Sequence, residues 1–205
     1  MYKNQMTFQK VVCVLVLVAS ALVFVYSLGI STDLYDAFSK AVMYPDDPEY
    51  TFSYVTGATI YYEMFDFNTL FTKVGIGLIV VTLVLFITNT HSRRKYYIGN
   101  YIAVGLSTAA NIGITVWCIP QILNYKARYQ NEVNFEELKA FSKDWGTLYI
   151  GPEDTFWFDA SFIVFGILLF TSCLLIVNLI WKIIMMNAEQ NAIGRKKDVV
   201  DFYAV

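Results

Sequence analysis

The sequence predicts an all-α integral membrane protein, a four-transmembrane-helix bundle that carries a small helical extracytoplasmic domain. Hydrophobic residues make up 57% of the 205-residue chain, more than a soluble domain of this size can cover with polar side chains. They gather in four runs that approach or exceed the roughly 20 residues a helix needs to cross hydrocarbon. Two long segments between these runs are rich in aromatic residues, which favours a compact domain built from both.

The first element is a polar tail, residues 1–10, followed by the first predicted span, residues 11–30. A positive start before an apolar run is also typical of a signal peptide, and Ser27-x-Gly29 resembles a cleavage site. The apolar run exceeds the roughly 7–15 residues of a signal-peptide core. An uncleaved span is therefore the favoured interpretation, with cleavage as the alternative.

The first outer loop covers residues 31–69. Leu34, Phe38 and Val42 follow Ser31 at helical spacing, which predicts a short helix. The sequence Pro45-Asp46-Asp47-Pro48 then breaks it. Because its acids lack the alternating spacing of an EF-hand, a solvated turn is favoured over a calcium site. From about Thr59 the chain is expected to be helical again and to enter the second span, residues 70–90.

The turn at residues 91–96 is so short that the second span and the third, residues 97–119, must be antiparallel neighbours. Pro120 either kinks the third helix or ends it. In the second outer loop, residues 120–159, Asn134 and Glu137 form a capping-box-like start and Gly146 a stop. The fourth span covers residues 160–181, and residues 182–205 form a second tail into which the helix can continue.

Charge predicts the orientation of the spans. The two tails and the 91–96 turn carry nine Lys or Arg against three acids, whereas the two long loops, counted together with Lys73 at the outer end of the second span, carry six against fourteen. Basic residues near span ends stay in the cytoplasm. We therefore expect a multi-pass protein of the plasma membrane with both termini cytoplasmic. Arg93, Arg94 and Lys95 are the clearest topology signal and are expected to contact anionic lipid headgroups.

The third span is unusual in its content of small and polar residues. At 100° per residue its small side chains fall into two strips, on which other helices can approach closely. One strip holds Gly99, Ala103, Ser107 and Ala110, and the other holds Gly105, Ala109 and Gly113. A polar stripe of Asn100, Ser107, Asn111 and Thr115 adjoins them. Packing within the chain is favoured for these residues, and packing against a partner subunit is the alternative.

Depth in the membrane suggests which polar residues meet. Asn100 and Asn178 lie about equally far from the cytoplasmic ends of their spans, so we expect them to contact each other. Mid-membrane hydroxyls are expected to share one layer, comprising Ser20, Thr82, Ser107 and Thr171. Each such pair is worth about 0.6–2 kcal/mol.

Several kinds of chemistry are absent from the sequence. No ionisable residue falls near the middle of a predicted span, where ion-coupled transporters usually need one. The chain has one histidine, His91, and lacks a Cys-x-x-Cys pair and a glycine-rich phosphate loop. We therefore expect no catalytic, metal-binding or cofactor-binding residues, and no nucleic-acid partner.

The outer loops are strongly aromatic, and we expect most of these rings to form the core of the outer domain. The remainder would form a surface for a partner, since aromatic side chains suit protein and sugar interfaces. The residues proposed for that surface are Tyr61, Tyr62, Trp145 and Trp157.

In topology alone, four spans with both ends inside, the chain resembles claudin-type and tetraspanin-type proteins. It lacks their loop cysteine motifs, so no family function follows from the resemblance. The sequence favours a non-enzymatic accessory or scaffold subunit of a larger membrane complex, for example a transporter complex. The alternative is a receptor-like module for an extracellular peptide or carbohydrate, and a channel or transporter formed by oligomerisation is less favoured.

Overall fold

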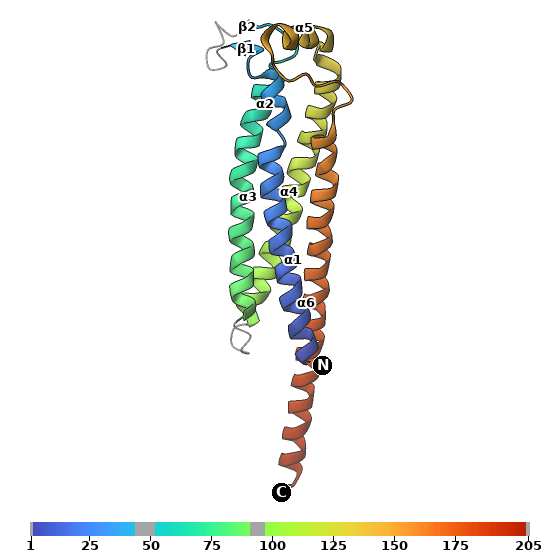
Figure 1. The fold of residues 1–205 in the computed structure, drawn as a ribbon. Helices are drawn as coiled ribbons and strands as arrows, with labels where there is room; N and C mark the ends of the chain where they lie inside the picture. The colour runs from blue at the N-terminus through green and yellow to red at the C-terminus, as the bar shows by residue number, and fades with distance from the viewer. Residues whose placement is uncertain (1, 44–51, 91–96, 204–205) are drawn as a thin grey trace.

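Four long helices pack side by side in the computed structural model (Figure 1). The structure describes residues 2–43, 52–90 and 97–203, with side-chain surroundings for 4–32, 34–42, 53–88 and 100–188. The long helices are α1 (Tyr2–Gly29), α3 (Ile60–Thr90), α4 (Tyr97–Glu132) and α6 (Phe156–Tyr203). Each contains a segment long and apolar enough to cross a membrane.

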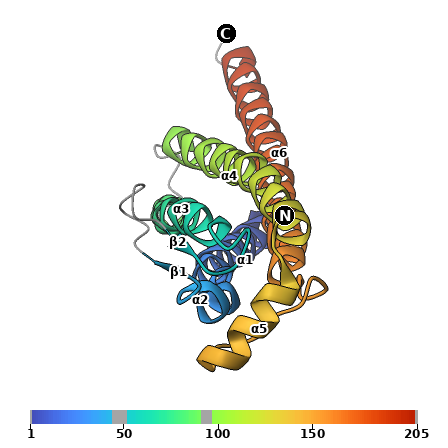
Figure 2. The same ribbon diagram turned by 90° about the horizontal axis from the view of Figure 1, so that it is seen from above.

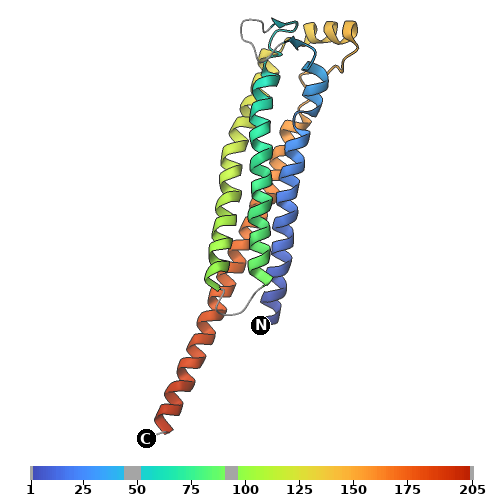
Figure 3. The same cartoon turned by 90° about the vertical axis from the view of Figure 1, so that its left-hand side faces the viewer.

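The helices form a closed ring in which α1 contacts α3 and α6, and α4 contacts the same two helices. Figure 2 shows this ring seen from above. We call the end at which α1 and α4 begin the base, and the opposite end the cap. The helix α6 has 48 residues, about 70 Å at 1.5 Å per residue, and continues past the base towards the C-terminus (Figures 1 and 3).

Each long helix buries one narrow seam, whose residues recur at alternating spacings of three and four. On α1 the seam comprises Gln5, Gln9, Val12, Val16, Ala19, Val23, Tyr26 and Ile30. On α3 it comprises Tyr61, Met64, Asn68, Phe71, Gly75, Leu78, Thr82 and Leu85. This repeat is typical of nearly parallel helices with knobs-into-holes packing.

The faces away from these seams are apolar as well. Large hydrophobic side chains are exposed along all four helices, among them Val18, Val80, Val116 and Phe170. Exposed apolar surface of this extent is unusual for a protein surrounded by water. The helices are therefore compatible with a multi-pass membrane protein.

The helices extend beyond the predicted spans. Residues 2–10 belong to α1, and α6 continues from the fourth span to Tyr203. Pro120 lies inside α4, which continues to Glu132. Pro120 is exposed and the residue one turn before it, Val116, is 68% exposed, so the proline lies on the outer face of the helix, where it does not disturb the buried seam.

The cap contains two short helices and two short strands. The helices are α2 (Thr32–Phe38) and α5 (Phe135–Trp145), and the strands are β1 (Val42–Met43) and β2 (Phe52–Ser53). The strands pair antiparallel, with Val42 opposite Ser53, a feature that the all-α prediction missed. Helix α5 lies across the end of the bundle (Figure 3).

The predicted limits of α5 are confirmed. The Asn134 side chain accepts hydrogen bonds from the backbone N–H groups of Glu136 and Glu137, at 3.2 and 3.3 Å. Gly146 follows the last turn with φ of 63°, the left-handed conformation of a helix stop. Leu138 and Phe141 form the buried side of the helix.

The two long loops contact each other through a turn that contains Thr56 and Gly57. The Asn134 N–H donates to the Thr56 carbonyl at 3.0 Å, and the Thr56 N–H donates to the Glu137 carboxylate at 2.8 Å. This second hydrogen bond lowers the pKa of Glu137, because it stabilises the charged form. Gly57 lies against Glu132 with φ of 80°.

Candidate docking surfaces

The first small-residue strip of α4 faces the inside of the bundle. Ala103 is 6% exposed and Ser107 is fully buried, and Ala110 is half-buried. Gly99 belongs to α4, but its surroundings lie outside the described residues. Small side chains in the seam let α4 come close to its neighbours.

The second strip faces outwards. Gly105, Ala109 and Gly113 are exposed, and a Cβ atom added to either glycine would meet nothing within 4 Å. Packing of this strip within the chain, the favoured interpretation of the sequence, is therefore wrong. The reason is the rotation of α4 about its axis. Its buried seam runs through Val104, Ser107, Asn111 and Ile114, so the strip lies on the opposite side of the helix and faces away from the ring.

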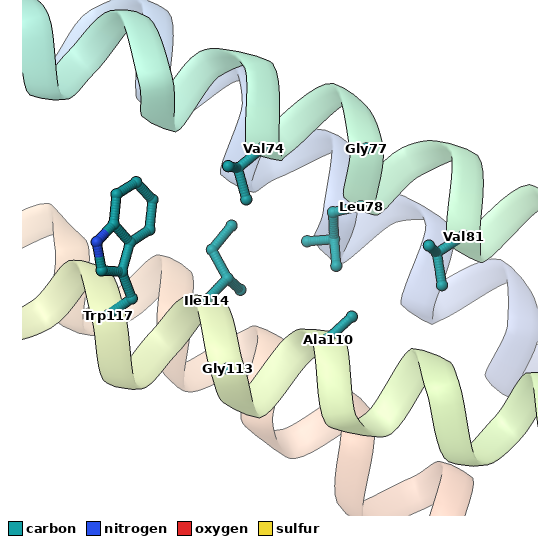
Figure 4. A pocket seen from close by; sticks show the side chains of 8 residues that line it. All are labelled: Val74, Gly77, Leu78, Val81, Ala110, Gly113, Ile114 and Trp117. Atoms are coloured by element: carbon teal, nitrogen blue, oxygen red, sulfur yellow. The ribbon is translucent and has the colours of Figure 1, made fainter.

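A hollow of about 400 Å³ lies next to this strip, between α3 and α4 (Figure 4). Its lining is apolar and comprises Val74, Gly77, Leu78 and Val81 of α3 and Ala110, Gly113, Ile114 and Trp117 of α4. Gly77 and Gly113 are both exposed and open to the outside. The strip and the hollow together form one outward apolar surface, which we call the α3–α4 face.

A different glycine, Gly75, makes the close helix contact. It is buried in the seam of α3, and a Cβ atom added there would lie 3.4 Å from the Cα of Phe24 on α1. The sequence analysis did not identify Gly75 as a packing residue. Its place in the three-four repeat of α3 is the signal that could have identified it.

The mid-bundle hydroxyls do not share one hydrogen-bonded layer, although two of them pair. Ser20 of α1 and Thr82 of α3 share a hydrogen bond of 2.9 Å, and Thr171 bonds to its own helix at Leu168. The buried Ser107 hydroxyl has no hydrogen-bond partner in the part of the chain that is described. On α4, the amide nitrogen of Asn111 donates to Ser172 of α6 at 2.8 Å, a contact that the sequence did not predict.

Asn100 and Asn178 both lie buried at the base, but each accepts a hydrogen bond from another residue. Lys182 donates to the Asn100 side-chain oxygen at 2.6 Å, and Gln5 donates to the Asn178 oxygen at 3.0 Å. The sequence interpretation placed Gln5 and Lys182 in the tails. The spacing of Gln5, Gln9 and Val12 continues the repeat of α1, and this signal could have shown that the glutamines are buried.

The four aromatic residues proposed as a partner surface differ in how far they are exposed. Tyr61 is 3% exposed because it lies in the seam of α3, so its assignment to a surface is wrong. Tyr62 and Trp157 are half-buried. The Trp157 ring covers Gly29, where a Cβ atom would lie 2.6 Å from it. Trp145 remains as a surface residue, at 57% exposed.

Trp145 belongs to a stack of three rings on the cap. Phe141 stacks on Trp145 with ring centroids 5.7 Å apart, and Tyr54 stacks on Phe141 at the same distance. Tyr54 also contacts Trp145 directly, with ring centroids 6.1 Å apart. Tyr54 is 42% exposed, whereas Phe141 is buried. The stack therefore presents two large aromatic side chains to the outside, one from each loop.

Ion pairs join the helices at the cap end. Arg128 of α4 contacts Glu63 of α3 at 2.5 Å and Glu132 at 3.0 Å, and Lys126 contacts Asp159 of α6 at 2.6 Å. Exposed pairs of this kind each contribute about 0–1 kcal/mol. They therefore contribute little to the stability of the bundle and act mainly on the orientation of the helix ends.

The remaining predicted residues, Arg93, Arg94 and Lys95, lie outside the described residues. Within the described ranges, no group of three or more His, Cys, Asp or Glu residues is placed to hold a metal ion. No protein-family profile, curated protein or solved structure matches the chain. Its function therefore has to be argued from its surfaces.

Proposed function

We propose that the chain is a non-enzymatic subunit or scaffold of a larger assembly in the plasma membrane. In this proposal the four long helices span the bilayer, both termini are cytoplasmic, and the cap is a small outer domain. The excess of basic residues in the tails and the acidic loops support this orientation. A transporter complex is one assembly of this kind.

The α3–α4 face is the observation that carries the proposal. In hydrocarbon, apolar side chains gain little by meeting each other, and helices associate where small residues let their backbones approach. Gly105, Ala109 and Gly113 provide such a strip, and no helix among the described residues covers it. The hollow beside them (Figure 4) can take side chains of a second helix.

Replacing Gly105 or Gly113 with leucine is expected to abolish capture of the partner and leave the fold intact. A Cβ atom at either position has no described atom of the chain within 4 Å, and leucine favours a helix over glycine by about 0.5–1 kcal/mol. The measurement is cross-linking in native membranes, followed by purification in mild detergent and mass spectrometry. Gly166→Leu is the matched control, because Gly166 is equally exposed and open but lies on α6.

Two results would contradict the proposal. If the unaltered chain purifies alone as a monomer and cross-links to no stoichiometric partner, it is not a subunit. If Gly105→Leu and Gly113→Leu capture the same partner as Gly166→Leu does, a partner exists but docks elsewhere.

The stack of Tyr54, Phe141 and Trp145 favours a second candidate function, a receptor-like module. Exposed aromatic rings bind sugar faces and peptide side chains with large contact area and little loss of conformational freedom. Because the stack joins both outer loops, a ligand there would contact the whole cap. In this candidate the basic cytoplasmic segments pass on the signal.

Trp145→Ala is expected to weaken binding of such a ligand about tenfold, which corresponds to about 1.4 kcal/mol. The measurement is binding of the purified protein to peptide and glycan arrays, followed by titration of any compound that binds. Phe156→Ala is the control, since Phe156 is 71% exposed but lies outside the stack. Equal binding by both variants would show that the stack is not the binding site.

A further inference from the structure

The hollow between α3 and α4 differs at its two ends. Because α3 runs from the cap to the base and α4 runs back, Val74 and Trp117 lie at its cap end, and Val81 and Ala110 lie at its base end (Figures 1 and 4). Its lining is apolar, and its volume of about 400 Å³ lies in the range of small-molecule sites. In the bilayer of the proposed function, this hollow opens towards lipid.

A cation lies at the cap end of the hollow. Lys73 is exposed and lies one helical turn before Gly77, on the same side of α3. It is the one charged residue among residues 67–90, and residues 97–125 of α4 contain none. Within the described ranges no acidic side chain forms an ion pair with Lys73. The nearest acid along α3, Asp66, is about 10 Å away along the helix axis.

Trp117 adds a second polar group at the same end. Its ring is half-buried and lies at the end of the hollow, with the indole nitrogen on the side facing away from Leu78 and Val81 (Figure 4). The Phe67 ring contacts it, with centroids 5.4 Å apart. Tryptophan rings favour the boundary between hydrocarbon and headgroups, since the ring is apolar and its N–H group is a donor. The hollow is thus apolar along its length and polar at one end, which suits an amphipathic ligand.

We propose that the hollow binds a phospholipid with a net negative headgroup, one acyl chain lying between α3 and α4 and the phosphate contacting Lys73. An ammonium group binds phosphate as a point charge. A net negative lipid neutralises Lys73, whereas a zwitterionic lipid brings a cation of its own. The headgroup lies at the cap end, which is the outer leaflet in the proposed orientation.

A lipid fits this end of the hollow better than a partner helix does. A helix would have to place an acidic side chain beside Lys73 within the membrane, which is costly, whereas lipid phosphates already lie at the level of the headgroups. The inference rests on the membrane placement in the proposed function but not on the partner subunit. Gly105 and Ala109 lie outside the lining of the hollow, so a helix can still dock on them when the lipid is bound.

The test is native mass spectrometry of the full chain, stripped of lipid in detergent and titrated with single lipids. The probes are dioleoyl phosphatidylglycerol, which is net negative, dioleoyl phosphatidylcholine, which is zwitterionic, and dioleoylglycerol, which has the same acyl chains without phosphate. Phosphatidylglycerol is expected to bind about tenfold more tightly than dioleoylglycerol, and more tightly than phosphatidylcholine. The proposal is overturned if phosphatidylglycerol binds no more tightly than either of the other two.

The first variant, Lys73→Met, removes the cation. Its affinity for phosphatidylglycerol is expected to fall about tenfold, to the level of dioleoylglycerol. Lys10→Met is the matched control, because Lys10 is also an exposed lysine next to an apolar run but lies on α1 near the base. Equal losses in the two variants would show general attraction between lysines and anionic lipid, and would overturn the proposal.

The second variant, Gly77→Leu, fills the hollow. A Cβ atom there has no described atom within 4 Å, so we expect the chain to stay folded and to bind phosphatidylglycerol at least about tenfold more weakly. Gly105→Leu is the control, since Gly105 is equally exposed and open. It should keep lipid binding, although it abolishes capture of the partner. If Gly77→Leu binds the lipid as well as Gly105→Leu does, the lipid does not occupy the hollow and the proposal is overturned.

Discussion

Replacing Gly57 with alanine is expected to detach the first outer loop from α4 and α5. A Cβ atom there would lie 2.6 Å from the carbonyl carbon of Glu132 and 2.9 Å from the Cα of Val133, both of which are backbone atoms. The left-handed backbone costs alanine about 1–2 kcal/mol, and the overlap adds about 1–3 kcal/mol. The hydrogen bonds of Thr56 to Asn134 and Glu137 would be lost with the contact.

Hydrogen exchange of the purified protein measures this effect, as faster exchange at the Thr56 and Asn134 amides. The effect has two causes, the left-handed backbone and the steric overlap, and Gly146→Ala tests the first of them alone. Gly146 also has a positive φ of 63°, but it has open space around it. We expect Gly146→Ala to show only the backbone penalty, about 1–2 kcal/mol, with the Thr56 contact preserved. If Gly57→Ala exchanges no faster than Gly146→Ala, the close approach at Glu132 is not a constraint on the cap.

The second large effect is expected for Gly75→Leu, which should force α1 and α3 apart. A leucine side chain at this position must displace the backbone of Phe24, because a Cβ atom alone already contacts it at 3.4 Å. Overpacking of this kind costs about 1–3 kcal/mol, and the shift spreads along both helices, since the seams on either side are continuous. The measurement is the unfolding midpoint in detergent, with near-ultraviolet circular dichroism as a check on packing.

Gly77→Leu is the matched control for Gly75→Leu. Gly77 is two residues away on the same helix, and its Cβ position has no atom within 4 Å. The same substitution there should be neutral or stabilising by up to about 1 kcal/mol. Similar losses for the two variants would show that leucine is poorly tolerated along α3 in general, and would remove the special role of Gly75.

The sequence predicted the presence and order of the four long helices because each contains an apolar run long enough to cross a membrane. It did not predict their ends, since the helices continue beyond the apolar runs. It also predicted the ends of α5, since the Asn134 cap and the Gly146 stop depend on neighbouring residues only. It failed to predict which face of each helix is buried. Burial of Tyr61 and exposure of Gly105 depend on how the helices rotate about their axes, and in an apolar environment hydrophobicity does not distinguish the inner face from the outer one.

The buried polar residues at the base of the bundle were missed for a different reason. Gln5, Gln9 and Lys182 are polar residues at the ends of apolar runs, and such residues ordinarily mark where a span stops. Here the three-four repeat continues through them, so that repeat was a better guide to burial than hydropathy. Asn178 could be recognised as important from its depth, but its hydrogen-bond partner could not.

The ring arrangement also determines the order in which the bundle can be completed. The seam of α1 contacts α6 as well as α3, yet α6 begins more than 120 residues after α1 ends. During synthesis, Gln5 and Tyr26 therefore wait for the last helix before they can form their hydrogen bonds to Asn178 and to the Trp157 carbonyl. In a nascent chain that lacks α6, the side of the α1 seam that packs against α6 stays exposed. Chaperones and proteases recognise exposed surfaces of this kind. The first helix thus makes folding of the whole chain depend on its final quarter.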